Sequence, residues 1–277
     1  MLAFVLGKGE VFLMVNEYPQ VMTIAGSDSD GSAGMQADMN TFLARKVYGA
    51  SILTAAVAGN SYRIHASHAL PVDFIKEEFK AIADDFKILA TKTGMLTDTK
   101  TIHAVIESYQ KYNFGPLIVD PVIITKHGAM LLEQEAYETI RDELIPLATV
   151  ITPNFYEAQK LAESGLESEA EIVEVAEKLQ AMGAKNVVIK GEHNGDSETV
   201  KDYVLLEDGK NFWLEDEYID TEHINGTGDT YSACIAAELA KGASIEEAIR
   251  ISKKYTHDAI KNEIAVGHKF GPINHWV

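Results

Sequence analysis

The stretch Gly226-Thr-Gly-Asp-Thr230 combines residue types that could bind an anion and remove a proton. Its glycines let the backbone turn tightly, and the alanine-rich run that follows predicts a helix with partial positive charge at its N-terminus. Gly226, Thr227 and Gly228 would then form an anion hole, while Asp229 could accept the proton of an attacking hydroxyl as a general base. The alternative is that Asp229 only caps the helix. No lysine follows the glycines, which excludes a Walker A loop.

Two carboxylates and a lysine elsewhere in the chain could complete such a site. Asp120 follows a short apolar stretch, and Glu157 lies three residues after Asn154 at a predicted helix start. Asp120 and Glu157 would suffice for Mg²⁺, which needs few protein carboxylates and keeps its waters. A helix-capping box explains the spacing of Asn154 and Glu157 equally well. Lys190, directly before Gly191, could reach a phosphate, although a lone lysine is usually a surface charge.

Short β-branched runs alternate with longer helical patterns along the chain. Strands are expected at about 21–25, 51–57, 117–119, 149–151 and 186–190, a hairpin at 203–214, and helices at 35–46, 73–86, 98–112, 230–241 and 245–262. This alternation predicts an α/β fold with a largely parallel sheet and helices on both faces. The carboxyl ends of the strands, with the polar residues that follow them, would meet at one edge. No repeat or linker divides residues 14–277, so a single domain is expected.

Charge and cysteine content narrow the expected partners and setting. The formal net charge of -18 repels phosphate backbones, so nucleic acid is not an expected partner. Cys234 is the one cysteine, which leaves no intrachain disulfide and favours a cytoplasmic location. The apolar N-terminal stretch is too short to span a bilayer. Residues 1–13 are interpreted as an upstream extension, because Met14 directly precedes the predicted domain.

These stretches together resemble the ribokinase-like superfamily, in the branch of the hydroxymethylpyrimidine (phosphate) kinases and the bacterial pyridoxal kinases. The matching segments are Thr23–Asp28, Gly34–Asp38, Lys92–Leu96, Asp120–Val122, Ile151–Asn154 with Glu157, Val188–Gly191, Gly226–Asp229, Val266–His268 and Gly271–Pro272. The resemblance implies a three-layer α/β fold and ATP-dependent, Mg²⁺-assisted phosphorylation of a hydroxymethyl group on a flat heteroaromatic ring. It also implies a homodimer, and it leaves a monovalent cation requirement open.

The resemblance also implies roles for individual residues. Asp229 takes the position of the base, and Gly226 to Gly228 form the anion hole. ATP would lie at Asn154, Thr227 and Gly228, Lys190 and Gly191, and Lys253, with Asp120 and Glu157 at the metal. The ring pocket would be lined by Ser27, Asp38, Gly59, Met95, Val122 and Asp229. Residues 123–128, which include His127, would be a flap that excludes water.

Two departures from the pyrimidine kinases bear on the substrate. Asp229 stands where those kinases usually have cysteine, and Gly59 stands where they place a glutamine that reads the aminopyrimidine. A lost amide leaves that edge of the substrate unpaired and makes room for the ring of vitamin B6.

A pyridoxal or pyridoxine kinase is therefore expected, transferring the γ-phosphoryl group of ATP to the 5′-hydroxymethyl. The alternative is a hydroxymethylpyrimidine or hydroxymethylpyrimidine-phosphate kinase of thiamine synthesis, and dual activity stays open. A catalytically silent ligand-binding homologue is a third reading. The complete set of Asp120, Glu157, Lys190 and Asp229 argues against it.

Overall fold

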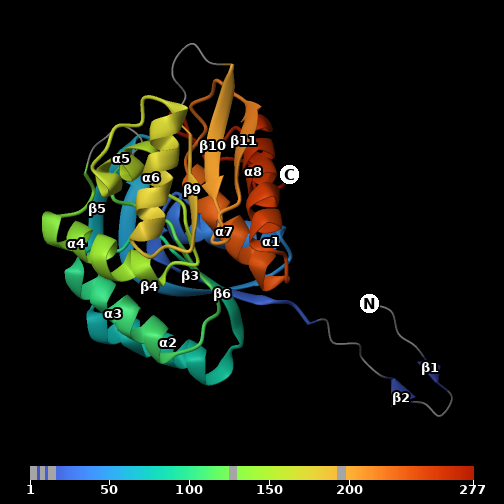
Figure 1. Ribbon diagram of the computed structural model, residues 1–277. Coiled ribbons are helices and arrows are strands. Elements are labelled where there is room, and N and C mark those ends of the chain that lie inside the picture. Colours follow the sequence, from blue (N-terminus) through green and yellow to red (C-terminus); the bar gives the residue numbers. More distant parts are fainter. Residues whose placement is uncertain (1–4, 7–9, 12–16, 125–129, 192–197) are drawn as a thin grey trace.

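The computed structural model describes residues 5–6, 10–11, 17–124, 130–191 and 198–277. Nine strands form its main sheet: β3 (Gln20–Asp28), β4 (Tyr48–Asn60), β5 (Arg63–Ala69), β6 (Ile88–Thr93), β7 (Leu117–Val119), β8 (Val150–Ile151), β9 (Asn186–Ile189), β10 (Thr199–Leu205) and β11 (Asn211–Glu217). Their order across the sheet is β11-β10-β9-β8-β7-β6-β3-β4-β5 (Figure 1). The six strands from β9 to β4 run parallel, and β5 and β10 are antiparallel to their neighbours.

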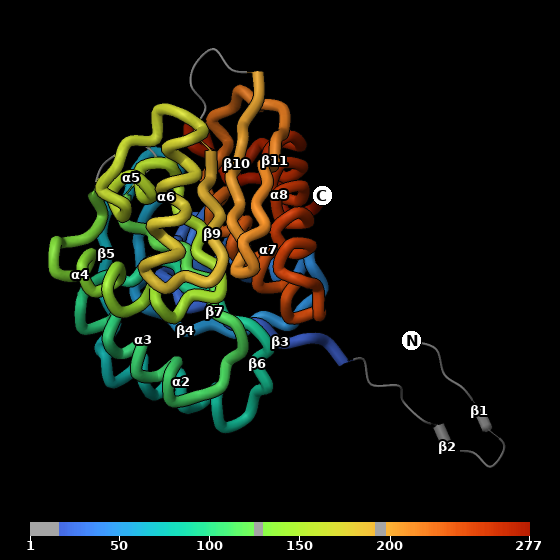
Figure 2. Tube along the Cα trace, in the orientation of Figure 1, coloured from blue at the N-terminus to red at the C-terminus, as the bar shows by residue number. Residues whose placement is uncertain are grey.

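Helices cover both faces of this sheet. They are α1 (Gly34–Ala44), α2 (Val72–Asp85), α3 (Thr99–Lys111), α4 (Gln134–Thr139), α5 (Phe155–Ala162), α6 (Glu169–Ala181), α7 (Thr227–Ala240) and α8 (Ile245–Lys261), with a π turn at Ile140–Leu144 and a 3₁₀ turn at Ile145–Leu147. Helices α1, α7 and α8 pack against one face, and α2 to α6 against the other (Figure 2). The predicted three-layer α/β fold is confirmed.

The central strands are apolar on both faces, as a covered parallel sheet requires. In β7, Leu117 and Val119 belong to the core beneath α2 to α6, whereas Ile118 belongs to the core beneath α1, α7 and α8. Adjacent side chains point to opposite faces of the sheet, so a short continuous apolar run contributes side chains to both cores. These runs fix the layers, and they bring the carboxyl ends of the parallel strands to one edge.

Three segments differ from the sequence-based prediction. Strand β3 extends to Asp28, beyond the predicted strand at 21–25, and β6 was not predicted as a strand. Residues 63–69, for which no strand was predicted, form the edge strand β5. This strand is exposed along most of its length and pairs only with β4, so it carries no apolar alternation by which it could be recognised. The predicted hairpin is present, with Gly209 at φ 84° in its turn.

At the N-terminus, β1 (Val5–Leu6) and β2 (Glu10–Val11) form a separate two-stranded antiparallel sheet (Figure 1). The interpretation of residues 1–13 as an extension outside the domain stays a prediction. Among the described residues, no helix is both long and apolar enough to cross a bilayer.

Candidate active site

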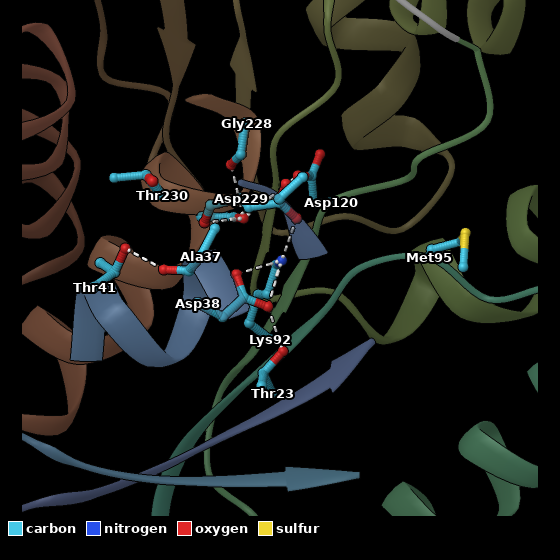
Figure 3. Close-up of polar contacts among 12 residues, drawn as sticks. Thr23, Ala37, Asp38, Thr41, Lys92, Met95, Asp120, Gly228, Asp229 and Thr230 are labelled. Atoms are coloured by element: carbon cyan, nitrogen blue, oxygen red, sulfur yellow. Dashed lines mark hydrogen bonds and ion pairs between the residues drawn. The ribbon is translucent and has the colours of Figure 1, made fainter. Parts of the chain in front are cut away.

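Four charged side chains from four different elements lie together at the carboxyl edge of the sheet. Lys92 comes from β6, Asp120 directly follows β7, and Asp229 lies in the first turn of α7 (Figure 3). Lys190 directly follows β9. The Nζ atom of Lys92 is 3.1 Å from Oδ1 of Asp229, and the Nζ atom of Lys190 is 3.2 Å from Oδ1 of Asp120. The predicted convergence of polar residues at this edge is therefore present for Asp120, Lys190 and Asp229, whereas Lys92 was not predicted to belong to the site.

The start of α7 depends on two glycines. Gly226 has φ 80°, and a Cβ atom there would lie 2.2 Å from the carbonyl oxygen of Ser32, so no other residue fits without a backbone shift. A Cβ atom on Gly228 would lie 3.2 Å from Nζ of Lys190 and 3.4 Å from Oδ2 of Asp120. The missing side chain thus lets these two charges lie close to the helix N-terminus. A helix N-terminus beside a lysine suits an anion such as a phosphate.

Asp229 does not cap α7. Gly226 is the N-cap residue, and no side chain makes a capping hydrogen bond there. The Asp229 side chain is 18% exposed and faces the ammonium of Lys92. Burial by itself would raise the pKa of Asp229, but the Lys92 charge and hydrogen bond more than offset it and leave this pKa below its ordinary value. The carboxylate is therefore ionised and able to accept a hydrogen bond from a hydroxyl.

Asp38 lies behind Lys92, on the side away from Asp229. Nζ of Lys92 is 2.7 Å and 2.9 Å from the two carboxylate oxygens of Asp38, and the hydroxyl of Thr23 donates to Asp38 at 2.5 Å (Figure 3). The side chains of Lys92 and Asp38 are both fully buried. Asp38 was expected to line the ring pocket, but in this structure it contacts Lys92 and Thr23 and has no surface to offer a substrate.

Asp120 is buried between β7 and α7. Besides Lys190, its carboxylate accepts a hydrogen bond of 3.4 Å from the hydroxyl of Ser232. The burial of Lys190 would lower its pKa, but the neighbouring Asp120 and Glu157 carboxylates raise it above the ordinary value, so the ammonium stays charged. Asp120 and Lys190 thus form an ion pair beside the first turn of α7.

Asn154 and Glu157 form the capping box at the start of α5. The Asn154 side chain accepts from the Glu157 backbone N–H, and the Glu157 carboxylate accepts from the Asn154 backbone N–H. Their other polar atoms hold the chain after β7: Glu157 accepts from the N–H of Ile123, and Asn154 donates to the carbonyl of Ile124. Burial and the nearby Asp120 raise the pKa of Glu157 to about 7. The capping box that was the alternative explanation of their spacing is therefore present. Their contact with metal or nucleotide stays a prediction.

Two of the residues predicted at the nucleotide are joined by an aspartate that the sequence analysis missed. Asp202 in β10 accepts from the backbone N–H of Gly191 at 2.9 Å and pairs with Nζ of Lys253 at 3.0 Å. Asp202 is buried. The sequence signal that could have indicated it is a single acidic residue in the otherwise apolar second half of β10. It connects the end of β9 to α8.

The remaining residues of the predicted ring pocket lie at several places along the same edge. Met95 follows β6 and points away from the Lys92 cluster, with its methyl against Gly26 (Figure 3). Ser27 lies near the end of β3, and Val122, after β7, has φ 49°. Gly59 lies in the β4–β5 hairpin, paired with Ile64.

The predicted flap is described only at its ends. Ile124 and Met130 form an antiparallel bridge, and the N–H of Leu131 donates to the carbonyl of Ile123 at 2.8 Å. His127 and the rest of 125–129 lie outside the described residues. The two ends of this segment are thus adjacent, directly after Asp120.

The carboxylates near this edge bear on the metal that the resemblance implies. No group of three or more histidine, cysteine, aspartate or glutamate side chains that could hold a metal occurs among the described residues. Mg²⁺ needs only one or two carboxylates when phosphate oxygens and water complete its shell. Asp120, whose carboxylate lies close to Gly228 at the N-terminus of α7, fits that requirement.

Comparison with known proteins places the chain in a family. A family profile described as phosphomethylpyrimidine kinase matches residues 28–274. The chain belongs to this family of kinases. Two curated relatives are named hydroxymethylpyrimidine/phosphomethylpyrimidine kinase. The one from Haemophilus influenzae is 43% identical and covers 93% of this chain and 96% of its own, and the one from Bacillus subtilis is 40% identical and covers 93% and 94%.

Solved structures of both branches share the fold. An ADP complex of Bacillus subtilis pyridoxal kinase has a TM-score of 0.85 at 36% identity, covering 94% of this chain and 98% of its own. The phosphomethylpyrimidine kinase of Clostridium difficile has a TM-score of 0.77 at 37% identity, covering 87% and 99%. The expected membership of the ribokinase-like superfamily, in this branch, is confirmed.

The expectation of a pyridoxal kinase is wrong. The family profile and the curated relatives carry the name of the pyrimidine kinases, and pyridoxal kinases occur only among the structural neighbours. The expectation depended on two positions, Asp229 and Gly59. An aspartate in place of a cysteine exchanges one proton acceptor for another, so by itself it favours neither ring. Gly59 exchanges two backbone hydrogen bonds with the Ser29 hydroxyl, and one missing amide removes only one of several contacts that a ring can make.

Proposed function

We propose that this protein is a hydroxymethylpyrimidine and phosphomethylpyrimidine kinase that uses ATP. The observation that carries the proposal is the Asp229 carboxylate, partly exposed in the first turn of α7 and paired with Lys92, in a chain of the phosphomethylpyrimidine kinase family. An ionised carboxylate beside an anion-binding helix N-terminus is what phosphoryl transfer to an alcohol requires.

Each of these residues at the carboxyl edge of the sheet then has one role in the reaction. Asp229 accepts the proton of the substrate hydroxyl as that oxygen attacks. The backbone N–H groups at the start of α7, together with Lys190, stabilise the negative charge on the phosphoryl group. Asp120 would hold Mg²⁺ at the phosphate oxygens, and the ion when bound would neutralise part of their charge. Contacts of Asn154, Gly191 and Lys253 with the nucleotide, a homodimer and a cytoplasmic location remain part of the proposal.

Steady-state kinetics on three substrates test the proposal. Hydroxymethylpyrimidine, its monophosphate and pyridoxal are each offered with ATP and Mg²⁺. The kcat/KM for at least one pyrimidine is expected to exceed that for pyridoxal. Failure to phosphorylate either pyrimidine would sink the proposal.

Replacing Asp229 with asparagine tests its role as the base. Asparagine keeps the size of the side chain but cannot take up the proton, so kcat should fall by roughly 10²–10⁴-fold with little change in KM. Asp208→Asn, in the turn between β10 and β11, serves as the matched control and should leave kcat unchanged. An unaltered kcat in Asp229→Asn would remove the assignment of Asp229 as the base.

A further inference from the structure

Lys92 is a buried ammonium shared between two carboxylates. It contacts Asp38 through two distances of 2.7 Å and 2.9 Å and Asp229 through one of 3.1 Å. Lys92 comes from β6, Asp38 from α1 and Asp229 from α7, so the cluster joins three elements at one point. The hydroxyl of Thr23 in β3 fixes the far carboxylate. Asp229 is the only one of the two acids with exposed surface.

The charges of this cluster explain why both acids are present. Two carboxylates this near to one another would repel, and the ammonium between them removes that cost. If Asp229 were the sole partner, its protonation would leave Lys92 as an uncompensated buried cation, which is strongly unfavourable. With Asp38 in place, Lys92 keeps a counter-ion before and after the proton moves. Asp229 is thereby free to take up the proton and release it.

Other charged groups also face Asp229. Lys190 from β9 lowers its pKa, and the negative charge of Asp229 in turn acts on His275 near the C-terminus. Burial lowers the pKa of His275 to about 4, so this ring is neutral. Asp120 lies across from Lys92 and adds negative charge at the same edge. Within the described part of the chain, Lys92 is the one of these cations that donates a hydrogen bond to the Asp229 carboxylate.

We propose that Lys92 is a positioning residue, anchored by Asp38, that orients the Asp229 carboxylate and keeps it negatively charged until the substrate hydroxyl attacks. The inference rests on the proposed function for its role in catalysis. Its electrostatic part concerns this cluster alone, and it can be measured without any substrate.

A thiol introduced by Asp229→Cys reports the electrostatic effect of Lys92 directly. The rate of alkylation by iodoacetamide is measured against pH, which gives the pKa of the new thiol. The native Cys234 contributes little, because it is buried and burial raises its pKa to about 11. The thiol is expected to titrate below the ordinary cysteine pKa of about 8.5. Adding Lys92→Met should raise its midpoint by about one pH unit or more.

A second variant moves the midpoint in the opposite direction. Adding Asp38→Asn to Asp229→Cys removes the competing carboxylate, so Lys92 should stabilise the thiolate more and the midpoint should fall. The matched control is Arg45→Met, which breaks an ion pair between the same two helices, α1 and α7, at Glu238. It should leave the midpoint in place. An unchanged midpoint with both Lys92→Met and Asp38→Asn, or one that Arg45→Met shifts equally, overturns the inference.

Kinetics of the single variant Lys92→Met connect this effect to catalysis. With Asp229 intact, kcat should fall and the acidic limb of its pH profile should move to higher pH, while the KM for ATP stays within about twofold. An acidic limb that stays in place would overturn the catalytic part of the inference. If the wild-type protein phosphorylates no pyrimidine, the proposed function fails, yet the alkylation midpoints still decide the role of Lys92.

Discussion

Three lysines near the carboxyl edge of the sheet each lie against an acid that is itself buried. Lys92 pairs with Asp38, Lys190 with Asp120, and Lys253 with Asp202. Removing one member of such a pair leaves the other unpaired in the interior, at a cost of about 3–5 kcal/mol. A fall in activity at these positions is therefore informative only beside a measured free energy of unfolding. The three lysines differ in the contacts that any exposed part of the side chain can make with a ligand.

Among these lysines, Lys190 is the one whose replacement we expect to affect ATP binding most directly. Its ammonium lies close to Gly228 at the N-terminus of α7, so Lys190→Met should raise the KM for ATP about tenfold or more by removing a charged contact with phosphate. The KM for the pyrimidine should change little. Lys201→Met is the control, because Lys201 pairs with Glu169 and Glu215 at the surface of the neighbouring strand. Equal effects of the two variants on the KM for ATP would contradict this role.

Among the elements, helix α7 has an N-terminus held by backbone contacts on two sides. Its N-cap Gly226 has a positive φ and lies against the backbone of Ser32, which leads into α1. The neighbouring Asn225 receives a hydrogen bond from Ile273 and donates one to Gly271, so a β-bridge holds the preceding loop as well. Helix α7 therefore starts where these two backbone contacts place it, and Asp229 is held with it.

Gly226→Ala tests this restraint. The positive φ alone costs about 1–2 kcal/mol for an alanine, and the contact with the Ser32 carbonyl adds to that loss and displaces the helix start. Urea unfolding should show the loss, and kcat should fall with it. Gly209→Ala is the matched control, with φ 84° and no atom within 4 Å of the added methyl, so it should cost only the conformational part. Similar losses in both variants would mean that the close contact has no effect.

At the scale of the whole molecule, the end of the chain returns to the active-site edge. The ring of His275 shares a hydrogen bond of 2.9 Å with the hydroxyl of Thr230, the residue after Asp229. The hydroxyl of Tyr255 in α8 donates to the carbonyl of His275. The C-terminal segment thus links α7 and α8, and it does so with a neutral imidazole.

This link makes stability depend on pH. The pKa of His275 is lowered to about 4 by burial, so between about pH 6.5 and pH 4 the unfolded chain binds a proton that the folded chain does not. Stability is complete above that window and falls as the pH drops through it, by about 3 kcal/mol for this group. His275→Gln should be less stable than wild type at pH 7, and the difference should shrink toward pH 4.5. Urea unfolding at both pH values measures it, and a difference independent of pH would contradict the shift.

The sequence by itself determined the α/β architecture, the edge at which polar residues gather, and the kinase family. These depend on local patterns: apolar runs such as Leu117–Val119 that serve two cores, and glycines at the start of a helix. It did not determine the substrate, because the expectation of a pyridoxal kinase followed from two positions, Gly59 and Asp229, against matches along the whole chain. Only the tertiary structure decided which charges are paired. Lys92 lies 54 residues from Asp38 and 137 from Asp229 along the chain, and no periodic pattern relates them. Their pairing follows from the packing of α1 and α7 against one face of the sheet, where burial requires each charge to find a partner.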